Sequence, residues 1–414
     1  MRPGQIGIPL GNELAPPRRA RLRSTAGTSN IDGSPLDLTR ILKVAPYMPH
    51  RRRIAINTGG GDAPGLNAVI QAVVYAASRH GWEVFGVRDG YDGLLFPERY
   101  QGGLVKLDRE MVRNISHLGG TILGTTNRSD PFRQCVVGSD GGVVERDRSD
   151  DVVSRLREAG IETLIVVGGD GSLAIAHGLS QKGLCVVGVP KTIDNDLEAT
   201  VLTFGFDSAV AFATECIDRL HSTAEAHKRI MVVEVMGRYA GWIALNAGIA
   251  GRADAILIPE VPYDIEKVAD HIRRRNSAER PYAIVVAAEG ARPVGGKRTV
   301  RAAAQPGALE RLGGIADVVA GQLQELTVRE SRSVVLGHLL RGGSPTALDR
   351  LLGLSFGAAA VKALADGQND VMVVLDPPHI TYAPLRQALE RQKTVPPHGY
   401  GIVTARALEI AFGD

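Results

Sequence analysis

The chain has little cysteine and no long apolar run. Its three cysteines, Cys135, Cys185 and Cys216, lie far apart in 414 residues and show no metal-binding spacing. Such sparse usage excludes a disulfide framework and fits a reducing compartment. No apolar run approaches the roughly 20 residues that a membrane-spanning helix needs. We therefore expect a cytoplasmic protein without a membrane partner.

The chain after residue 53, called the body here, lacks an excess of basic residues, although the net charge of the whole chain is +3. Residues 1–53 carry ten Lys and Arg against three Asp and Glu, a balance of +7, so the remainder carries 38 against 42, or −4. Because the body is slightly acidic, the sequence indicates no nucleic-acid partner. With 44% hydrophobic residues, the chain is long enough for two or three domains with cores of their own.

Residues 1–50 are rich in proline and arginine and show no sustained hydrophobic periodicity. They are predicted to be a basic, mostly disordered extension. The segment lacks both the amphipathic stripe of a transit peptide and the apolar centre of a secretory signal. A plain tail, or a start codon placed too early, is the preferred interpretation.

From Arg53 onward, short apolar strands alternate with helical patterns. Helices are predicted over about 66–80, 207–221, 315–326 and 346–365, with buried strands between such segments. Repeated βα units form parallel sheets that are covered on both faces. The pattern predicts an α/β fold with two Rossmann-like lobes, mainly parallel sheets flanked by helices, and an active site in the cleft between the lobes.

Three glycine-rich loops follow predicted strands. Residues 59–65 read GGGDAPG, residues 119–128 read GGTILGTTNR, and residues 168–172 read GGDGS. Backbone without side chains can approach a phosphate, and a helix N-terminus favours negative charge. Asp170 in the third loop suits a Mg²⁺ ion that bridges phosphate oxygens. A tight turn, with Asp170 or Ser172 capping the next helix, explains each loop nearly as well.

The loop at residues 190–196, which reads PKTIDND, follows another apolar strand. In open α/β sheets, ligands bind at the carboxyl ends of strands. Asp194 and Asp196 stand two positions apart, beside the cation of Lys191 and the hydroxyl of Thr192. These groups suit either metal-nucleotide binding or removal of a proton from an alcohol. Taken alone, the loop is equally compatible with an ordinary polar turn.

Together these loops resemble the phosphofructokinase family from Arg53 to near the C-terminus. The motifs appear in the family's order at 59–67, 119–128, 168–172, 190–196, 236–242 (MGRYAGW), 287–290 (AAEG) and 332–350. The last is the most specific, because Arg332 is followed at fixed spacing by Gly337-His338, Leu340-Arg341-Gly342-Gly343 and Asp349-Arg350. The resemblance implies transfer of the γ-phosphoryl group of a nucleotide to the 1-hydroxyl of fructose 6-phosphate.

The resemblance also implies roles for individual residues. Asp194 matches the general base, Thr192 would bond the transferring phosphoryl group, and Arg238 belongs to the catalytic set. Asp170, with Asp196 as a weaker candidate, would hold Mg²⁺. The nucleotide phosphates would be contacted by Gly61, Gly169, Asp170, Gly171, Ser172, Lys191 and either Arg128 or Asn127. Sugar-phosphate recognition would involve Thr192, Asp194, Met236, Gly237, Arg238, Glu289, His338 and Arg341, with Arg229 and Arg332 from a neighbouring subunit.

Those two arginines imply a homotetramer or a homodimer whose sites are completed between subunits. A surface ion pair remains the alternative for Arg229. By the same resemblance, residues 51–204 with about 341–395 would form the nucleotide-binding lobe and residues 205–340 the sugar-phosphate-binding lobe. Residues from about 396 to 414 would form a C-terminal helix.

Two positions resemble those that separate ATP-using from pyrophosphate-using relatives. Gly171 matches the ATP type, because an Asp there would place a charge where the α-phosphate lies. Lys191 matches pyrophosphate enzymes, although some ATP enzymes carry it too. Exclusion by a side chain is the harder constraint, so ATP is the favoured donor and pyrophosphate the alternative. A non-catalytic sensor on this fold is a second alternative. A related nucleotide or lipid kinase is a third, which the motif at 332–350 disfavours.

Overall fold

The computed structural model describes residues 52–137, 142–275, 281–302 and 310–414. The predicted extension over residues 1–50 lies outside them. Among the helices of the described ranges, none is long and apolar enough to cross a membrane.

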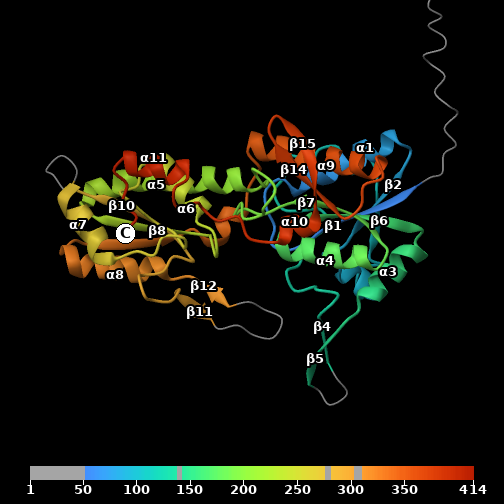
Figure 1. Cartoon of the computed structure of the whole chain (residues 1–414), viewed down its shortest axis with the longest axis horizontal. Helices are drawn as coiled ribbons and strands as arrows, with labels where there is room; N and C mark the ends of the chain where they lie inside the picture. Colours follow the sequence, from blue (N-terminus) through green and yellow to red (C-terminus); the bar gives the residue numbers. More distant parts are fainter. Residues whose placement is uncertain (1–51, 138–141, 276–280, 303–309) are drawn as a thin grey trace, which may run out of the picture. The chain divides into compact units, whose positions relative to one another are not determined.

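The first sheet has seven strands in the order β15-β14-β7-β6-β1-β2-β3 (Figure 1). Its strands are β1 (Arg53–Thr58), β2 (Glu83–Val87), β3 (Leu104–Leu107), β6 (Ile161–Gly168), β7 (Cys185–Pro190), β14 (Val371–Asp376) and β15 (His379–Pro384). The five inner strands are parallel, and the edge strands β3 and β15 are antiparallel to their neighbours. All the glycine-rich loops that follow inner strands therefore lie at one edge of this sheet.

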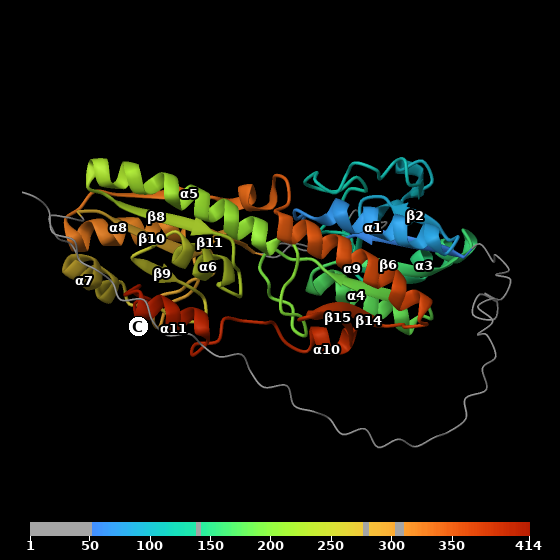
Figure 2. The ribbon, with the colours of Figure 1, turned by 90° about the horizontal axis from the view of Figure 1, so that it is seen from above.

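Helices cover both faces of the first sheet. On one face α1 (Leu66–Arg79) and α9 (Ala347–Ala365) lie side by side (Figure 2) and bury alternate strand residues such as Ile54 and Ile56. On the other face α3 (Ser149–Glu158), α4 (Asp170–Gln181) and α10 (Leu385–Leu389) pack over Ala55 and its neighbours. A side chain on Gly357 of α9 would approach the backbone oxygen of Val69 to 2.6 Å, which explains the close contact between α9 and α1.

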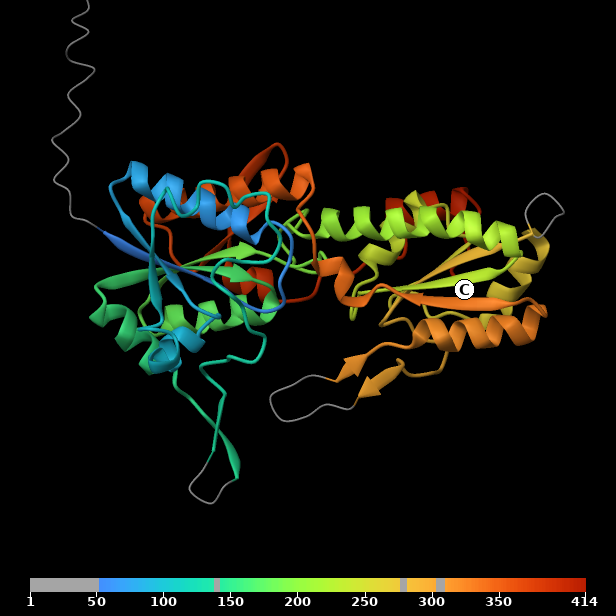
Figure 3. The same cartoon turned by 180° about the vertical axis from the view of Figure 1, so that it is seen from behind.

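The second sheet has four parallel strands in the order β13-β8-β10-β9. These are β8 (Ile230–Val235), β9 (Ala255–Leu257), β10 (Ala283–Ala288) and β13 (Ser331–Val335). One face is covered by α5 (Phe206–His227), α6 (Trp242–Ala250) and α11 (Tyr400–Ala407). The other face is covered by α7 (Ile265–Arg275) and α8 (Ile315–Thr327). Figure 3 shows α5 and α8 on opposite faces of this sheet.

Shorter elements lie outside the two sheets. They are α2 (Asp92–Leu95), the hairpin β4 (Gln134–Val137) with β5 (Val143–Arg146), the hairpin β11 (Val300–Ala302) with β12 (Arg311–Leu312), and the 3-10 turns at Pro97–Arg99 and Gly337–Arg341. The α/β class with mainly parallel sheets is confirmed. One predicted helix was too short, since α5 continues to His227 and buries Ala224 in its last turns.

The amino ends of α5 and α9 are joined by reciprocal capping. Both the backbone nitrogen and the hydroxyl of Ser208 donate to Asp349 Oδ2 at 2.7 Å. Thr346 caps α9 by accepting from the Asp349 nitrogen, and its hydroxyl donates to Asp207 at 2.5 Å. Asp349 is fully buried, and burial raises its pKa to about 6 although the hydrogen bonds from Ser208 oppose the shift. This junction connects a helix of the first sheet to a helix of the second.

Candidate active site

Hydrogen bonds connect the loops that follow β1, β6 and β7 with one another and with the loop at 119–128. The nitrogen of Gly60 donates to the Thr126 oxygen at 3.0 Å, and the Thr125 hydroxyl donates back to the Gly60 oxygen at 2.7 Å. The nitrogen of Lys191 donates to the Gly168 oxygen at 3.0 Å. The three glycine-rich loops and the loop at 190–196 therefore form one surface at the edge of the first sheet.

Lys191 supplies a buried cation under the first glycine loop. Its Nζ donates to the Gly61 oxygen at 2.6 Å. Burial, and then the positive charge of Arg341, lower the pKa of Lys191 to about 8. The carboxylates that oppose this shift are Asp196, Asp62 and Asp170. Lys191 is still mainly protonated at neutral pH, so it can face a phosphate as a cation.

Arg341 connects the signature motif at 332–350 to the same loop. Its Nη1 donates to the Asp62 oxygen at 3.1 Å. A side chain on Gly61 would come within 2.5 Å of that nitrogen, so in this arrangement the guanidinium occupies the space beside the glycine. The contact places the guanidinium of Arg341 beside the surface that the glycine-rich loops form at the edge of the first sheet.

Asp194 stands out because one of its carboxylate oxygens is buried without a partner. Its backbone nitrogen donates to Thr192 Oγ1 at 3.1 Å, which fixes the turn. Oδ1 has no hydrogen-bond partner among the residues that the structure describes. Burial, followed by the charge of Asp196, raises the pKa of Asp194, while Arg341 opposes the shift. A carboxylate with a raised pKa and a free oxygen suits a general base.

Two carboxylates could contribute to a magnesium site. Burial and the charge of Asp170 raise the pKa of Asp196, so a cation between them would relieve a repulsion. Within the described ranges, no three His, Cys, Asp or Glu side chains gather in a way that could hold a metal ion. Mg²⁺ often takes one or two carboxylates and completes its shell with phosphates and water. The pair fits that partial role, and its assignment stays a prediction.

Residues 168–172 form the turn into α4. Gly169 is the N-cap, and Asp170 Oδ1 accepts from the Gly171 nitrogen at 2.7 Å. The Ser172 side chain packs under the loop, because a side chain on Gly59 would meet its hydroxyl at 2.7 Å. A side chain on Gly171 would meet no atom within 4 Å. This open space is compatible with the predicted position of a nucleotide phosphate.

The predicted sugar-binding loops lie together at the carboxyl ends of β8 and β10. The Glu289 nitrogen donates to the Val235 oxygen at 2.9 Å, and the Gly290 nitrogen donates to the Gly237 oxygen at 3.1 Å. Gly237 has a φ of 142°, a conformation that favours glycine. Met236, which directly follows β8, is partly exposed at the same edge.

The positive charge of Arg238 acts on the carboxylate of Glu289. Burial raises the pKa of Glu289, and the positive charges of Arg238 and Arg341 oppose this shift. Glu289 also raises the pKa of Asp194, so the groups of the two sheets act on one another. Arg238 donates through Nη2 to the Glu310 oxygen, whereas its buried Nη1 has no partner in the described part of the chain.

Arg229 and Arg332 lie at the other end of the second sheet. Both form ion pairs with Glu330, Arg229 at 2.7 Å. Arg229 precedes β8, whereas Met236 follows it, so the two residues are separated by about 20 Å at roughly 3.3 Å per strand residue. The structure does not bring these arginines to the site of their own chain.

Two further candidates are exposed. Asn127 and Arg128 both face solvent, and the Arg128 nitrogen donates to Thr126 Oγ1 at 3.1 Å. Nothing in the described contacts chooses between their side chains as the phosphate ligand. His338 is exposed as well.

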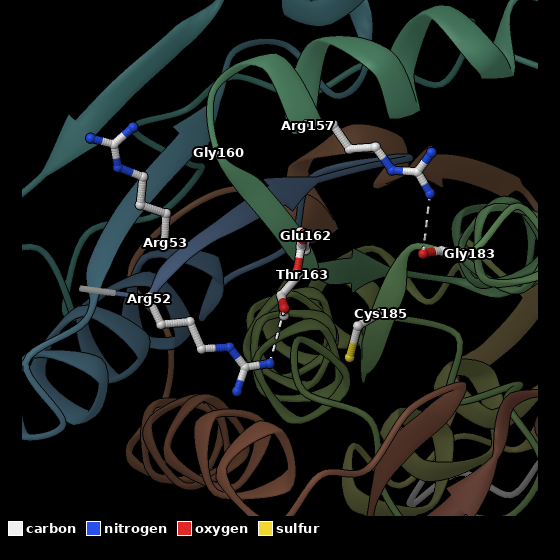
Figure 4. Close-up of a pocket in the computed structure, with 8 residues that line it drawn as sticks. All are labelled: Arg52, Arg53, Arg157, Gly160, Glu162, Thr163, Gly183 and Cys185. Carbon is white, nitrogen blue, oxygen red and sulfur yellow. Dashed lines mark hydrogen bonds between the residues drawn. The ribbon is translucent and has the colours of Figure 1, made fainter. Parts of the chain in front are cut away.

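A separate hollow lies at the opposite, amino-terminal edge of the first sheet (Figure 4). Its arginines point in different directions: Arg52 donates to Thr163 Oγ1 at 3.0 Å, Arg157 donates to the Gly183 oxygen at 3.5 Å, and Arg53 points away from both. Guanidinium groups that do not converge cannot grip one phosphate. The strand ends opposite this hollow remain the candidate active site.

A glycine cradle with a buried lysine, beside a carboxylate with a free oxygen, has the features of a phosphoryl-transfer enzyme. Residues 53–364 match the family described as phosphofructokinase. The chain is 49% identical over 366 residues to the ATP-dependent 6-phosphofructokinase of Chloroflexus aurantiacus, with 88% of this chain and 98% of that protein covered. The chain belongs to the phosphofructokinase family.

Other relatives show how varied the family is. The chain is 47% identical over 364 residues to the pyrophosphate–fructose 6-phosphate 1-phosphotransferase of Amycolatopsis methanolica, with 87% of this chain and all of that protein covered. The solved phosphofructokinase of Saccharomyces cerevisiae superposes with a TM-score of 0.70 at 31% identity. That match covers 86% of this chain and 47% of the yeast chain.

Two residues that support the loops lie outside every sequence motif. Lys393 contacts the loop at 190–196, and Glu260 accepts from the nitrogen of Gly241 at the end of the MGRYAG loop. Neither residue belongs to a recognisable motif, and Lys393 is 198 residues along the chain from Asn195, which it contacts. Only the fold reveals them.

Proposed function

We propose that this chain is an ATP-dependent 6-phosphofructokinase of glycolysis, which converts fructose 6-phosphate and ATP into fructose 1,6-bisphosphate and ADP. The observation that carries the proposal is the buried Oδ1 of Asp194, which has no hydrogen-bond partner in the described part of the chain and lies on the same loop as the Lys191 cation. Membership of the family and the close likeness to an ATP-dependent relative support it.

In this proposal Asp194 accepts the proton of the sugar 1-hydroxyl as the oxygen attacks the γ-phosphorus. A bond forms between O1 and phosphorus, and the bond from phosphorus to the bridging oxygen of ADP breaks. General base catalysis of this kind contributes about 10²–10⁴-fold in rate. In the proposed complex Thr192 and Lys191 bond the transferring group, and bound Mg²⁺ would neutralise phosphate charge. Because phosphoryl transfer needs little covalent chemistry from the protein, positioning supplies most of the rate.

The two substrates would occupy the two sets of loops. The nucleotide phosphates would lie against Gly61 and residues 168–172, with Arg128 or Asn127 at the rim. Fructose 6-phosphate would contact Met236, Gly237, Arg238 and Glu289, with His338 and Arg341 at its 6-phosphate. The buried Arg238 Nη1, which lacks a partner among the described residues, is the donor we assign to the sugar phosphate.

Pyrophosphate is the alternative donor for two reasons. Lys191 occupies the position that is lysine in pyrophosphate enzymes, and the relative from Amycolatopsis methanolica is named as a pyrophosphate-dependent enzyme. The test is the initial rate of fructose 1,6-bisphosphate formation with ATP or pyrophosphate, each with and without Mg²⁺. We expect Mg²⁺-dependent turnover with ATP. The rate with pyrophosphate should be at least about 10-fold lower, a difference that corresponds to about 1.4 kcal/mol. Turnover with pyrophosphate alone would reverse the donor assignment, and no product with either would favour the sensor.

We further propose that Arg229 and Arg332 complete the site of a neighbouring subunit in a homotetramer or homodimer. Their separation from the site of their own chain supports this arrangement. Arg332→Ala and Asp194→Asn chains, co-expressed with different tags, should recover roughly a quarter of wild-type turnover if subunits pair at random. Activity no higher than the sum of the two single variants would show that each site uses its own arginines.

We place the enzyme in the cytoplasm, since Cys135, Cys185 and Cys216 are all free thiols, as in a reducing compartment. Fractionation of cells that express the tagged chain checks this, and recovery outside the cytoplasmic fraction would contradict it.

A further inference from the structure

The segment between α10 and α11 runs past the catalytic loop. Figure 2 shows it leaving α10 toward α11. Gln392 forms an antiparallel bridge with Leu197, and the Lys393 nitrogen donates to the Asp196 oxygen at 2.8 Å. The segment therefore lies directly against residues that follow the proposed base.

The side-chain ammonium of Lys393 donates three hydrogen bonds where the segment meets the catalytic loop. Its Nζ donates to Asn195 Oδ1 at 2.8 Å, to the Thr200 oxygen at 2.8 Å and to the Val201 oxygen at 3.0 Å. An ammonium group has three donors, so each finds an acceptor. All three acceptors are neutral, which means that Lys393 is not simply one half of an ion pair.

Asn195 is the most consequential of these acceptors. It stands between Asp194 and Asp196, is buried, and has a φ of 50°, which an L residue rarely adopts. Its Oδ1 also accepts from the Thr203 nitrogen at 3.1 Å. The amide is thus held from both sides, by Thr203 and by Lys393, in the conformation that sets the directions of the two carboxylates.

The same segment also holds the start of α6. Trp242 Nε1 donates to the Lys393 oxygen at 3.0 Å. Glu260 accepts from the Val395 nitrogen at 2.8 Å and from the Gly241 nitrogen at 3.0 Å. These contacts use the backbone of the segment, so they survive replacement of the Lys393 side chain.

We propose that Lys393 is a positioning residue for phosphoryl transfer, which acts through Asn195 to hold Asp194 and Asp196 in place. This rests on the proposed function, in which Asp194 is the base. The printed contacts of the sugar-binding loop use the backbone of the segment, whereas the catalytic loop is held both by that backbone and by the lysine side chain. Loss of the side chain should therefore affect turnover and leave sugar binding nearly unchanged.

The main test is Lys393→Met, with Arg391→Met as the matched control. Arg391 lies two residues earlier and forms an exposed ion pair with Glu198 at 2.8 Å. Since a misplacement of 1 Å costs about 10²-fold, we expect Lys393→Met to lower kcat by about 10- to 100-fold, with the KM for fructose 6-phosphate within about threefold of wild type. Arg391→Met should keep both within about twofold. A wild-type kcat in Lys393→Met, or an equal loss in both variants, would overturn the proposal.

A double-mutant cycle asks whether the effect passes through Asn195. Asn195→Gly removes the acceptor and tolerates the left-handed conformation, so it should lower kcat by a similar factor. Adding Lys393→Met to it should then cost less than about twofold, because coupled residues are not additive. Independent, multiplying losses would contradict the route. If Lys393→Met does not fold, a wild-type kcat in Asn195→Gly would overturn the proposal by itself.

Hydrogen exchange provides a readout that does not depend on turnover. Amides in a peptide covering residues 195–203 should exchange faster in Lys393→Met than in wild type or Arg391→Met, while the strands of both sheets keep their protection. Unchanged exchange in that peptide would contradict positioning by Lys393. If the wild-type chain has no activity with either donor, the proposed function fails, whereas the exchange result still decides whether Lys393 holds the loop.

Discussion

Asp194→Asn is expected to lose about 10²–10⁴-fold in kcat, because asparagine keeps the shape of the side chain but cannot accept the sugar proton. Oδ1 has no partner among the described residues, so the substitution breaks no hydrogen bond there. The bond from the Asp194 nitrogen to Thr192 Oγ1 involves only the backbone of residue 194 and remains. The loop should therefore keep its conformation while the base is lost.

The stability of this variant gives a second expectation. Asp194 is desolvated and repelled by Asp196, which raises its pKa. A carboxyl whose pKa is raised by folding costs stability above that pKa, so a neutral amide should unfold at the same temperature as wild type or higher. The matched control is Glu198→Gln, which removes an acid four residues later and should keep kcat within about twofold.

Steady-state kinetics and thermal unfolding check both expectations. A large drop in kcat with the KM for fructose 6-phosphate within about threefold identifies a group that acts mainly in the transition state. A kcat within fivefold of wild type would show that another group removes the proton. A drop that comes with a lower unfolding temperature would show that Asp194 supports the loop rather than the reaction.

The regular core of the fold could be predicted from local sequence. Helices such as α1 carry a clear hydrophobic periodicity, and buried strands such as β10 are uninterrupted apolar runs. The edge strands β3 and β15 escaped prediction because both are only partly buried and lack a continuous apolar run. The hairpin β4–β5 was missed for a similar reason, since it pairs Gln134 with Arg146 and Cys135 with Glu145, and Val144 is exposed.

The candidate site could be predicted where its residues form local motifs, and could not where its contacts join distant parts of the chain. The glycine loops and the run at 190–196 are recognisable in the sequence, and their places at strand ends predict that they lie together. Lys393 lies 198 residues from Asn195, and no local pattern joins them. In the same way, the motif at 332–350 does not reveal that Arg332 and Arg341 lie at opposite ends of a strand of the second sheet. That separation comes from strand direction, since Arg332 is near the start of β13 and Arg341 lies beyond its end.

Gly171→Asp is expected to lower kcat/KM for ATP by about 100-fold, which corresponds to about 2.7 kcal/mol. In the proposed complex the new carboxylate lies beside the α-phosphate, and two like charges 4 Å apart repel by about 4 kcal/mol at an effective dielectric constant of 20. A side chain at this position would meet no protein atom within 4 Å, so the variant should fold. Its place in the first turn of α4 also suits an acid, because a helix N-terminus favours negative charge.

Gly171→Asn separates charge from size, because its side chain has nearly the same shape and no charge. We expect Asn to cost about 10-fold or less with ATP, whereas pyrophosphate, which has no α-phosphate to meet the side chain, should lose less than ATP in both variants. The ratio of kcat/KM for the two donors, measured in wild type and both variants, is the decisive quantity. Equal rates with ATP in all three proteins would place the nucleotide away from Gly171 and leave Lys191 as the residue that decides the donor.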